Sequence, residues 1–169
     1  KEDFDKLAHN INPSTDSKLN PRHKDTRKVG YDFTFSAPKS ASVLYAINND
    51  ERIRNVFENA VQGTMREIEH DMMTQKGQGK NKRHERTSNM VWASFTHKTA
   101  RPVNGEPDCH LHTHCFAFNT TWNEDKQRFQ AGEFGYIKKN APYYEAAFDA
   151  RFAKHMEAIG YNVERRGLS

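Results

Sequence analysis

The chain has 169 residues, of which 28% are charged and 35% hydrophobic, and its formal net charge is +4. This length suits one domain with a hydrophobic core and is short for two, so we expect a single domain over residues 1–169. The apolar residues recur in periodic segments, which excludes a disordered chain, and no stretch reaches the roughly 20 apolar residues of a membrane span.

The basic residues are unevenly distributed along the chain. One group precedes the first predicted strand and the other fills a glycine-containing stretch; the two groups are Arg22, Lys24, Arg27 and Lys28, and Lys76, Lys80, Lys82, Arg83 and Arg86. A pI of about 9.0 permits an anionic partner without requiring one. Solvated basic loops are the alternative interpretation of both groups.

The two cysteines, Cys109 and Cys115, lie six positions apart on a predicted strand. Such a spacing separates them by roughly 20 Å, which is too far for a disulfide. Free thiols are typical of a reducing cytoplasm, where we expect this protein to be. We expect no signal peptide.

In chain order, the first predicted elements are a short helix over residues 2–9 and a polar segment to residue 29. Residues 31–36 (YDFTFS) alternate aromatic with polar side chains, which predicts a half-buried strand. The sequence Ser36-Ala37-Pro38 then indicates the start of a helix that runs to about Ile47.

The next helix has the clearest pattern in the chain. Asn49 or Asp50 caps it, and apolar residues keep the i, i+3, i+4 spacing for about six turns, until the helix ends by Gly77. The basic stretch that follows, to Arg86, has no apolar residue to bury and is expected to be a mobile loop.

Strands are predicted over residues 90–97 and 110–119, followed by a turn at 122–126 and a short strand at 127–130. Asn140 caps a final helix that stops at Gly160, and residues 161–163 begin one more strand. Strands and helices without regular alternation indicate an α+β fold, with a mostly antiparallel sheet and helices packed on one face.

The segment Cys109-His110-Leu111-His112-Thr113-His114-Cys115 contains the strongest chemical signal. On a strand its three histidines share one face, and His97 ends the preceding strand, so antiparallel pairing would place a fourth imidazole beside them. Three imidazoles leave metal coordination positions for water or substrate, as in catalytic sites. Spacing alone does not choose three ligands among the four, and a surface row of histidines without metal is the alternative.

A family resemblance rests on several of these segments together. Residues 31–40 (YDFTFSAPKS) resemble the D-[LF]-T-F-S-A-P-K-S signature of the MobF-class conjugative relaxases, the TrwC family of HUH endonucleases. Residues 111–114 (LHTH) and 95–101 (FTHKTAR) resemble further motifs of that family, as does the helix end at residues 159–161. The resemblance covers about 130 residues in the expected order.

The resemblance implies site residues and a cofactor. It assigns His97, His112 and His114 as ligands of one divalent metal ion, without choosing among Mg, Mn, Zn and Ni, and it leaves His110 outside the ligand set. It places Asp32 near the catalytic centre, where a carboxylate orients a ligand histidine or takes a proton from an attacking tyrosine. An exposed strand residue is the alternative for Asp32.

Single-stranded DNA at a transfer origin is the partner that the resemblance implies, with other relaxosome proteins beside it in a bacterial cytoplasm. Candidate phosphate contacts are Lys39, Arg101, Lys80, Lys82 and Arg83. Trp92 and Phe116 are candidates for base stacking, with burial in the core as the alternative.

The implied activity is site- and strand-specific nicking, in which a tyrosine attacks a phosphodiester. The chain departs from the family in two ways: the loop between His97 and His112 is longer, and no tyrosine precedes Tyr31. We therefore expect a relaxase-like domain that is incomplete at both ends. The alternatives are a metal-stabilised DNA-binding module without catalysis and an unrelated His-x-His hydrolase; the metal, DNA sequence, oligomeric state and any attached helicase stay open.

Overall fold

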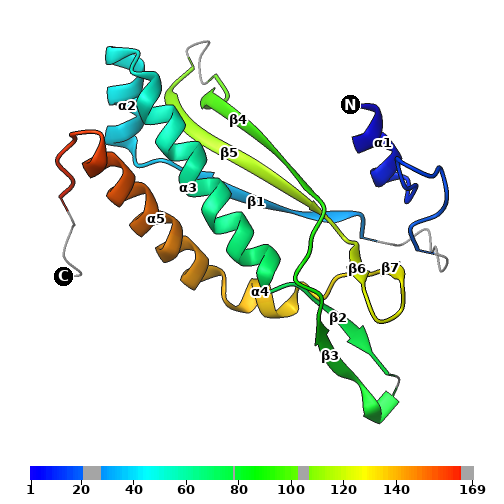
Figure 1. The fold of residues 1–169 in the computed structure, drawn as a ribbon. Helices are drawn as coiled ribbons and strands as arrows, with labels where there is room; N and C mark the ends of the chain where they lie inside the picture. Colours follow the sequence, from blue (N-terminus) through cyan, green and yellow to red (C-terminus); the bar gives the residue numbers. More distant parts are fainter. Residues whose placement is uncertain (21–27, 78, 103–106, 165–169) are drawn as a thin grey trace. The chain divides into compact units, whose positions relative to one another are not determined.

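The computed structural model describes residues 1–20, 28–77, 79–102 and 107–164. Arg22, Lys24 and Arg27 of the first basic group lie outside these ranges, as does Gly105 in the loop before His112. The helices and strands, in chain order, are α1 (Glu2–Ala8), β1 (Gly30–Ser36), α2 (Lys39–Asn48), α3 (Glu51–His70), β2 (Met73–Lys76), the 3-10 helix η1 (Gly79–Asn81), β3 (Arg83–Arg86), β4 (Trp92–Thr99), β5 (Cys109–Phe118), β6 (Thr121–Asn123), β7 (Arg128–Gln130), α4 (Gly135–Lys139) and α5 (Ala141–Ala158) (Figure 1).

The main sheet has three strands in the order β1-β5-β4, so β5 is its central strand. The backbone N–H of Ala37 donates to the carbonyl of Leu111 at 2.9 Å, and that of Asn119 donates to Val29 at 2.8 Å. Residue numbers therefore rise along β1 as they fall along β5, and the two strands are antiparallel. The predicted α+β class with an antiparallel sheet is confirmed.

The chain divides into two compact units, of which the first comprises residues 1–33, 67–94 and 115–140. In it, Phe4 of α1 packs its ring against Phe116 and Phe118 of β5, with centroids 5.7 and 5.0 Å apart. Two hairpins belong to the same unit, β2 paired with β3 and β6 paired with β7, both antiparallel (Figure 1).

The prediction of a mobile loop at residues 76–86 is wrong, because most of this stretch forms the β2–β3 hairpin. Lys76 pairs with Arg83 in the register, and its ammonium donates to Glu85 at 2.5 Å. Gly77 and Gly79 take positive φ angles of 86° and 57° at the turn. Backbone pairing and this ion pair hold a hairpin that has no apolar face, so the hydrophobic pattern that normally predicts strands was missing.

The second unit comprises residues 34–66, 95–114 and 141–169. Its core contains the two long helices α3 and α5, which lie side by side (Figure 1). Phe57 of α3 makes edge contacts with Phe148 and Phe152 of α5 at 5.8 and 5.7 Å. Phe35 of β1 reaches Phe148 at 5.2 Å, so the helices pack on the strand face that carries Phe35, as predicted. The prediction of one domain over residues 1–169 stays a prediction.

Several boundaries differ from those predicted. The helix expected to reach Gly77 ends at His70, and the expected turn at 122–126 begins with strand β6. The short helix α4 was not predicted. The strand expected at 161–163 does not form, because the backbone N–H of Tyr161 donates to Met156 at 3.1 Å and closes the end of α5. None of the helices in the described residues combines the length and apolarity needed to cross a membrane.

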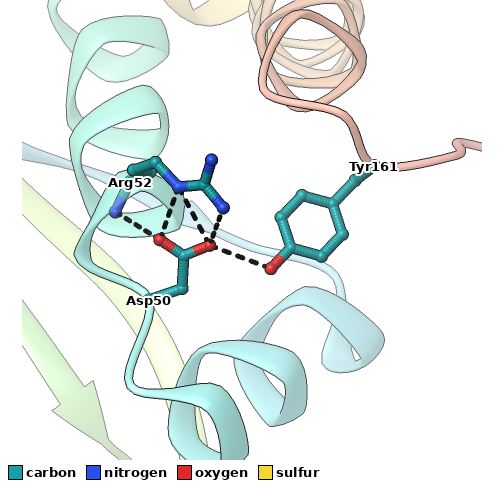
Figure 2. A network of polar contacts seen from close by, with 3 residues as sticks. All are labelled: Asp50, Arg52 and Tyr161. Carbon is teal, nitrogen blue, oxygen red and sulfur yellow. Dashed lines mark hydrogen bonds and ion pairs between the residues drawn. The ribbon is translucent and has the colours of Figure 1, made fainter.

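A polar network joins the start of α3 to the residue that follows Gly160 (Figure 2). Asp50 accepts hydrogen bonds from the backbone N–H of Arg52 at 3.0 Å and from its guanidinium at 2.8 and 2.9 Å. The hydroxyl of Tyr161 donates to the same carboxylate at 3.0 Å. The hydrogen bonds from Arg52 contribute most to lowering the pKa of Asp50, to about 2. Asp50 is thus the residue that caps α3, while Asn49 ends α2 with a φ of 48°.

We expect Asp50→Asn to lower the melting temperature by a few degrees at pH 7, because the guanidinium loses its charged acceptor. The carboxyl pKa is depressed in the folded protein, so its stabilising effect is present above the usual pKa of 3.8 and fades as the pH falls towards about 2. Thermal melts of both proteins from pH 7 to pH 2.5 should therefore show a difference that shrinks below about pH 4. A constant difference across this range would contradict the assignment, and Tyr161→Phe, which removes one hydrogen bond, is the control.

Candidate metal centre

Strand β5 presents its histidines on one face and a row of buried side chains on the other. Leu111, Thr113 and Cys115 are at most 1% exposed, while the alternate residues His110, His112 and His114 are half-buried. Burial raises the pKa of Cys115 to about 12, and the charge of Asp32 adds to this effect, so the thiol stays protonated. The buried face fixes the strand register, and the register fixes the histidines on the opposite face.

His97 of β4 joins this face from the neighbouring strand. The hydroxyls of Thr96 and Thr113 lie 2.9 Å apart and mark those residues as cross-strand partners. The next pair along these antiparallel strands is His97 with His112, whose ring centroids are 5.3 Å apart. His97 also lies 5.8 Å from His114, and His112 lies 5.3 Å from His114. The three rings therefore form a nearly equilateral triangle.

The ring separations in the triangle are close to those of three imidazoles bound to one metal ion. Three imidazoles with metal–nitrogen bonds of about 2.1 Å have ring centroids roughly 4.6–5.3 Å apart, for octahedral or tetrahedral angles. Two of the observed separations, both 5.3 Å, lie at the upper end of this range, and the third, 5.8 Å, exceeds it. Accordingly, no three His, Cys, Asp or Glu side chains in the described parts of the chain have donor atoms already placed to hold an ion. The donor set fits a metal in type and in ring spacing, and small side-chain rotations would complete the convergence.

Hydrogen bonds orient two of these rings. Nδ1 of His112 lies 2.9 Å from the carbonyl oxygen of His110, and because a carbonyl only accepts, this nitrogen carries the proton. Nε2 of His112 then has the lone pair that a metal requires. Nδ1 of His114 lies 3.2 Å from the hydroxyl of Thr34 on β1, so Nε2 would again be the ligating atom. Such contacts to the second nitrogen are typical of metal-ligating histidines.

His110 has a different place from the other three. Its ring stacks on His112 at 4.5 Å with an interplanar angle of 20°. Burial lowers the pKa of His110, and the neighbouring His112 and Lys39 lower it further. Among the described rings, His110 contacts only His112, whereas His97 contacts both His112 and His114, so His110 lies beside the triangle.

The other predicted site residues are not gathered into one cluster. Asp32 is exposed on β1, in the first unit, two positions before Thr34. Lys39 forms an ion pair with Asp108 and donates to the carbonyl of Cys109 at 3.1 Å. This ammonium holds the pKa of Asp108 below its usual range. Arg101 is exposed in the second unit.

The three remaining basic residues lie on the hairpin in the first unit. Lys80 is in η1, Lys82 follows it and Arg83 begins β3, and all three are exposed. The predicted phosphate contacts therefore belong to both units, with Lys39 and Arg101 in the second and the hairpin residues in the first.

Phe95 is a candidate for base stacking that the sequence analysis did not name. It lies two residues before His97, so it shares the histidine face of β4 and is the cross-strand neighbour of His114. Its side chain is 48% exposed. The two aromatic residues that the sequence suggested for base stacking, Trp92 and Phe116, are half-buried, and Phe116 packs against Phe4. The alternation of Phe95 with His97 was the signal that could have identified it.

The sequence model of the TrwC relaxase family matches residues 1–169. The chain is 30% identical, over 144 residues, to the multifunctional conjugation protein TraI of Escherichia coli (strain K12); the match covers 81% of this chain and 8% of TraI. A metal-free structure of the conjugative relaxase TrwC in complex with oriT DNA superposes with a TM-score of 0.87 and 28% identity, covering 98% of this chain and 57% of that one.

A metal-bound structure of the same relaxase with oriT DNA gives a TM-score of 0.85 and 28% identity, covering 96% of this chain and 56% of that one. The chain thus spans a small part of the curated relative and somewhat more than half of the relaxases in these structures. The whole-chain match, together with the shared fold, confirms the resemblance drawn from the sequence motifs. This chain belongs to the TrwC relaxase family.

Proposed function

We propose that this chain forms the metal- and DNA-binding part of a relaxase, which nicks one DNA strand at a transfer origin during conjugation. The observation that carries the proposal is the triangle of His97, His112 and His114 on one face of the sheet. Membership of the TrwC family supports it, since TrwC has been solved with oriT DNA and in a metal-bound form. We place the protein in the bacterial cytoplasm, with single-stranded DNA and other relaxosome proteins as partners.

The proposed ligands of one divalent ion are His97, His112 and His114. When bound, such an ion would stabilise negative charge on the non-bridging oxygens of the scissile phosphate. The three imidazoles are neutral ligands and would leave the charge of the ion undiminished. The hydroxyl of Thr34 and the carbonyl of His110 would keep the two β5 rings oriented. Asp32 is proposed as the carboxylate that orients a group or accepts a proton at this centre.

The proposed reaction is a transesterification. The phenolic oxygen of a tyrosine forms a bond to phosphorus and the bond to the 3′ oxygen breaks, which leaves a 5′-phosphotyrosine and a free 3′-hydroxyl. The number of phosphoester bonds is unchanged, so religation needs no further energy source. Tyr31 is not the proposed nucleophile, because its ring stacks on buried Phe134 with centroids 4.2 Å apart.

DNA would be held through charge and through stacking. Lys39, Arg101 and the hairpin residues Lys80, Lys82 and Arg83 are proposed to contact phosphates. Phe95, exposed opposite His114, is proposed to stack a base beside the scissile phosphate. Lys39 would exchange its ion pair with Asp108 for a phosphate, and because both side chains are more than half exposed, that exchange requires little structural change.

We expect His97→Ala, His112→Ala and His114→Ala each to reduce metal affinity at least 100-fold, whereas His110→Ala changes it less than about tenfold. Calorimetric titration and metal analysis of each folded variant measure this. Equal losses from all four substitutions would contradict the ligand assignment.

The protein should form a covalent, denaturant-resistant adduct with a single-stranded oligonucleotide carrying its transfer origin. The adduct should be lost with His112→Ala and retained with His110→Ala. Binding of the oligonucleotide without any adduct would instead favour a metal-stabilised DNA-binding module that lacks catalysis.

Substitution of Phe95 by Ala should weaken binding of a 12-residue oligothymidylate about tenfold, since an aromatic stacking partner is lost. Phe95→Trp should keep the affinity. Tyr143→Ala is the matched control, because Tyr143 on α5 is also an exposed aromatic residue in the second unit, at 57%. If Phe95→Ala weakens binding of a fully abasic 12-mer as strongly, Phe95 does not act by stacking.

A further inference from the structure

Two lysines contact one aromatic ring in the first unit. The ammonium of Lys28 lies 4.2 Å from the centroid of the Tyr31 ring, and that of Lys138 lies 4.3 Å from the same centroid. Lys28 precedes β1, whereas Lys138 belongs to α4, so the fold brings together two cations from distant parts of the sequence. Neither lysine was among the residues assigned to DNA from the family resemblance.

The ring that both lysines contact is fixed in place. Phe134, which is 2% exposed, stacks on Tyr31 with centroids 4.2 Å apart and an interplanar angle of 29°. The chain at Lys28 is also held, because the side-chain amide of Asn119 donates to the carbonyl of Lys28 at 3.1 Å. The backbone N–H of Asn119 donates to the next carbonyl, that of Val29, at 2.8 Å. The backbone N–H of Lys138 donates to the carbonyl of Phe134 at 2.9 Å, so the backbone is held at both lysines.

Their charges are close and uncompensated by the neighbours that the structure describes. The two ammonium nitrogens are no more than 8.5 Å apart, the sum of their distances from the shared centroid. Within the described ranges, neither lysine forms an ion pair with a carboxylate. The electron-rich ring attracts each cation but does not neutralise it. An anion bound to both would remove the repulsion between them.

We propose that Lys28 and Lys138 form a binding site for a phosphodiester of the nucleic-acid backbone. A phosphodiester has two non-bridging oxygens, one for each ammonium group. Phe134 and the lysines occupy the surroundings of the Tyr31 ring, so the site offers charge and no stacking platform for a base. The contact is therefore independent of sequence. This inference rests on the proposed function, which supplies nucleic acid as the partner.

The test compares Lys28→Gln, Lys138→Gln and the double variant with the unmodified chain. Fluorescence anisotropy measures binding of a 12-residue oligothymidylate and of a mixed-sequence 12-mer between 50 and 300 mM KCl. Loss of one phosphate contact lowers the slope of log K against log salt by about 0.7 for single strands, which is about fivefold in affinity at 100 mM salt. We expect this change in the double variant, equally for both oligonucleotides.

Two variants serve as controls. Lys139→Gln removes the same charge from the adjacent, exposed residue and should change affinity and slope less than Lys138→Gln does. Tyr31→Phe keeps the ring and should bind like the unmodified chain. A double variant that matches Lys139→Gln would overturn the site while leaving the proposed function intact. If the unmodified chain binds neither oligonucleotide at 50 mM salt, the proposed function fails together with this site. If the double variant binds oligoglutamate more weakly but binds DNA unchanged, the partner is an acidic protein and the proposal is overturned.

Discussion

The antiparallel pairing of β5 with β1 on one side and β4 on the other is the constraint on which the candidate site depends. Side chains alternate between the faces of a strand, so a slip of one residue would turn every histidine of β5 towards the buried side. The burial of Leu111 and Cys115 prevents such a slip. The hydroxyl pair of Thr96 and Thr113 then sets β4 against β5 and places His97 opposite His112.

The sheet also gives the four similar histidines different surroundings. His112 and His114 are held by a carbonyl and a hydroxyl at their Nδ1 atoms, whereas His110 stacks in parallel on His112. His97 instead contacts both His112 and His114 and closes the triangle. Imidazoles on one face of the sheet, together with basic side chains elsewhere, form a combination suited to a partner whose charge is carried by phosphates.

Charge in this protein is used in two distinct ways. Where a carboxylate lies within reach, basic residues stabilise the fold, as Arg52 does with Asp50 at the start of α3 and Lys76 does with Glu85 in the hairpin. Lys28 and Lys138 instead share an aromatic ring and have no carboxylate partner among the residues that the structure describes. Lys28 and Lys138 are therefore suited to bind an external anion without first breaking an ion pair.

The sequence by itself determined the fold class, the long helices and the strand that carries the histidines, because amphipathic periodicity and alternation are local properties of the chain. It did not identify the β2–β3 hairpin, whose charged strands lack an apolar pattern, nor the place of Phe95 beside His114. Which histidines form the triangle followed in the sequence from family resemblance alone. Only the tertiary structure brought His97 next to His112 and Lys28 next to Lys138, because such pairs depend on register and packing between segments far apart in the chain.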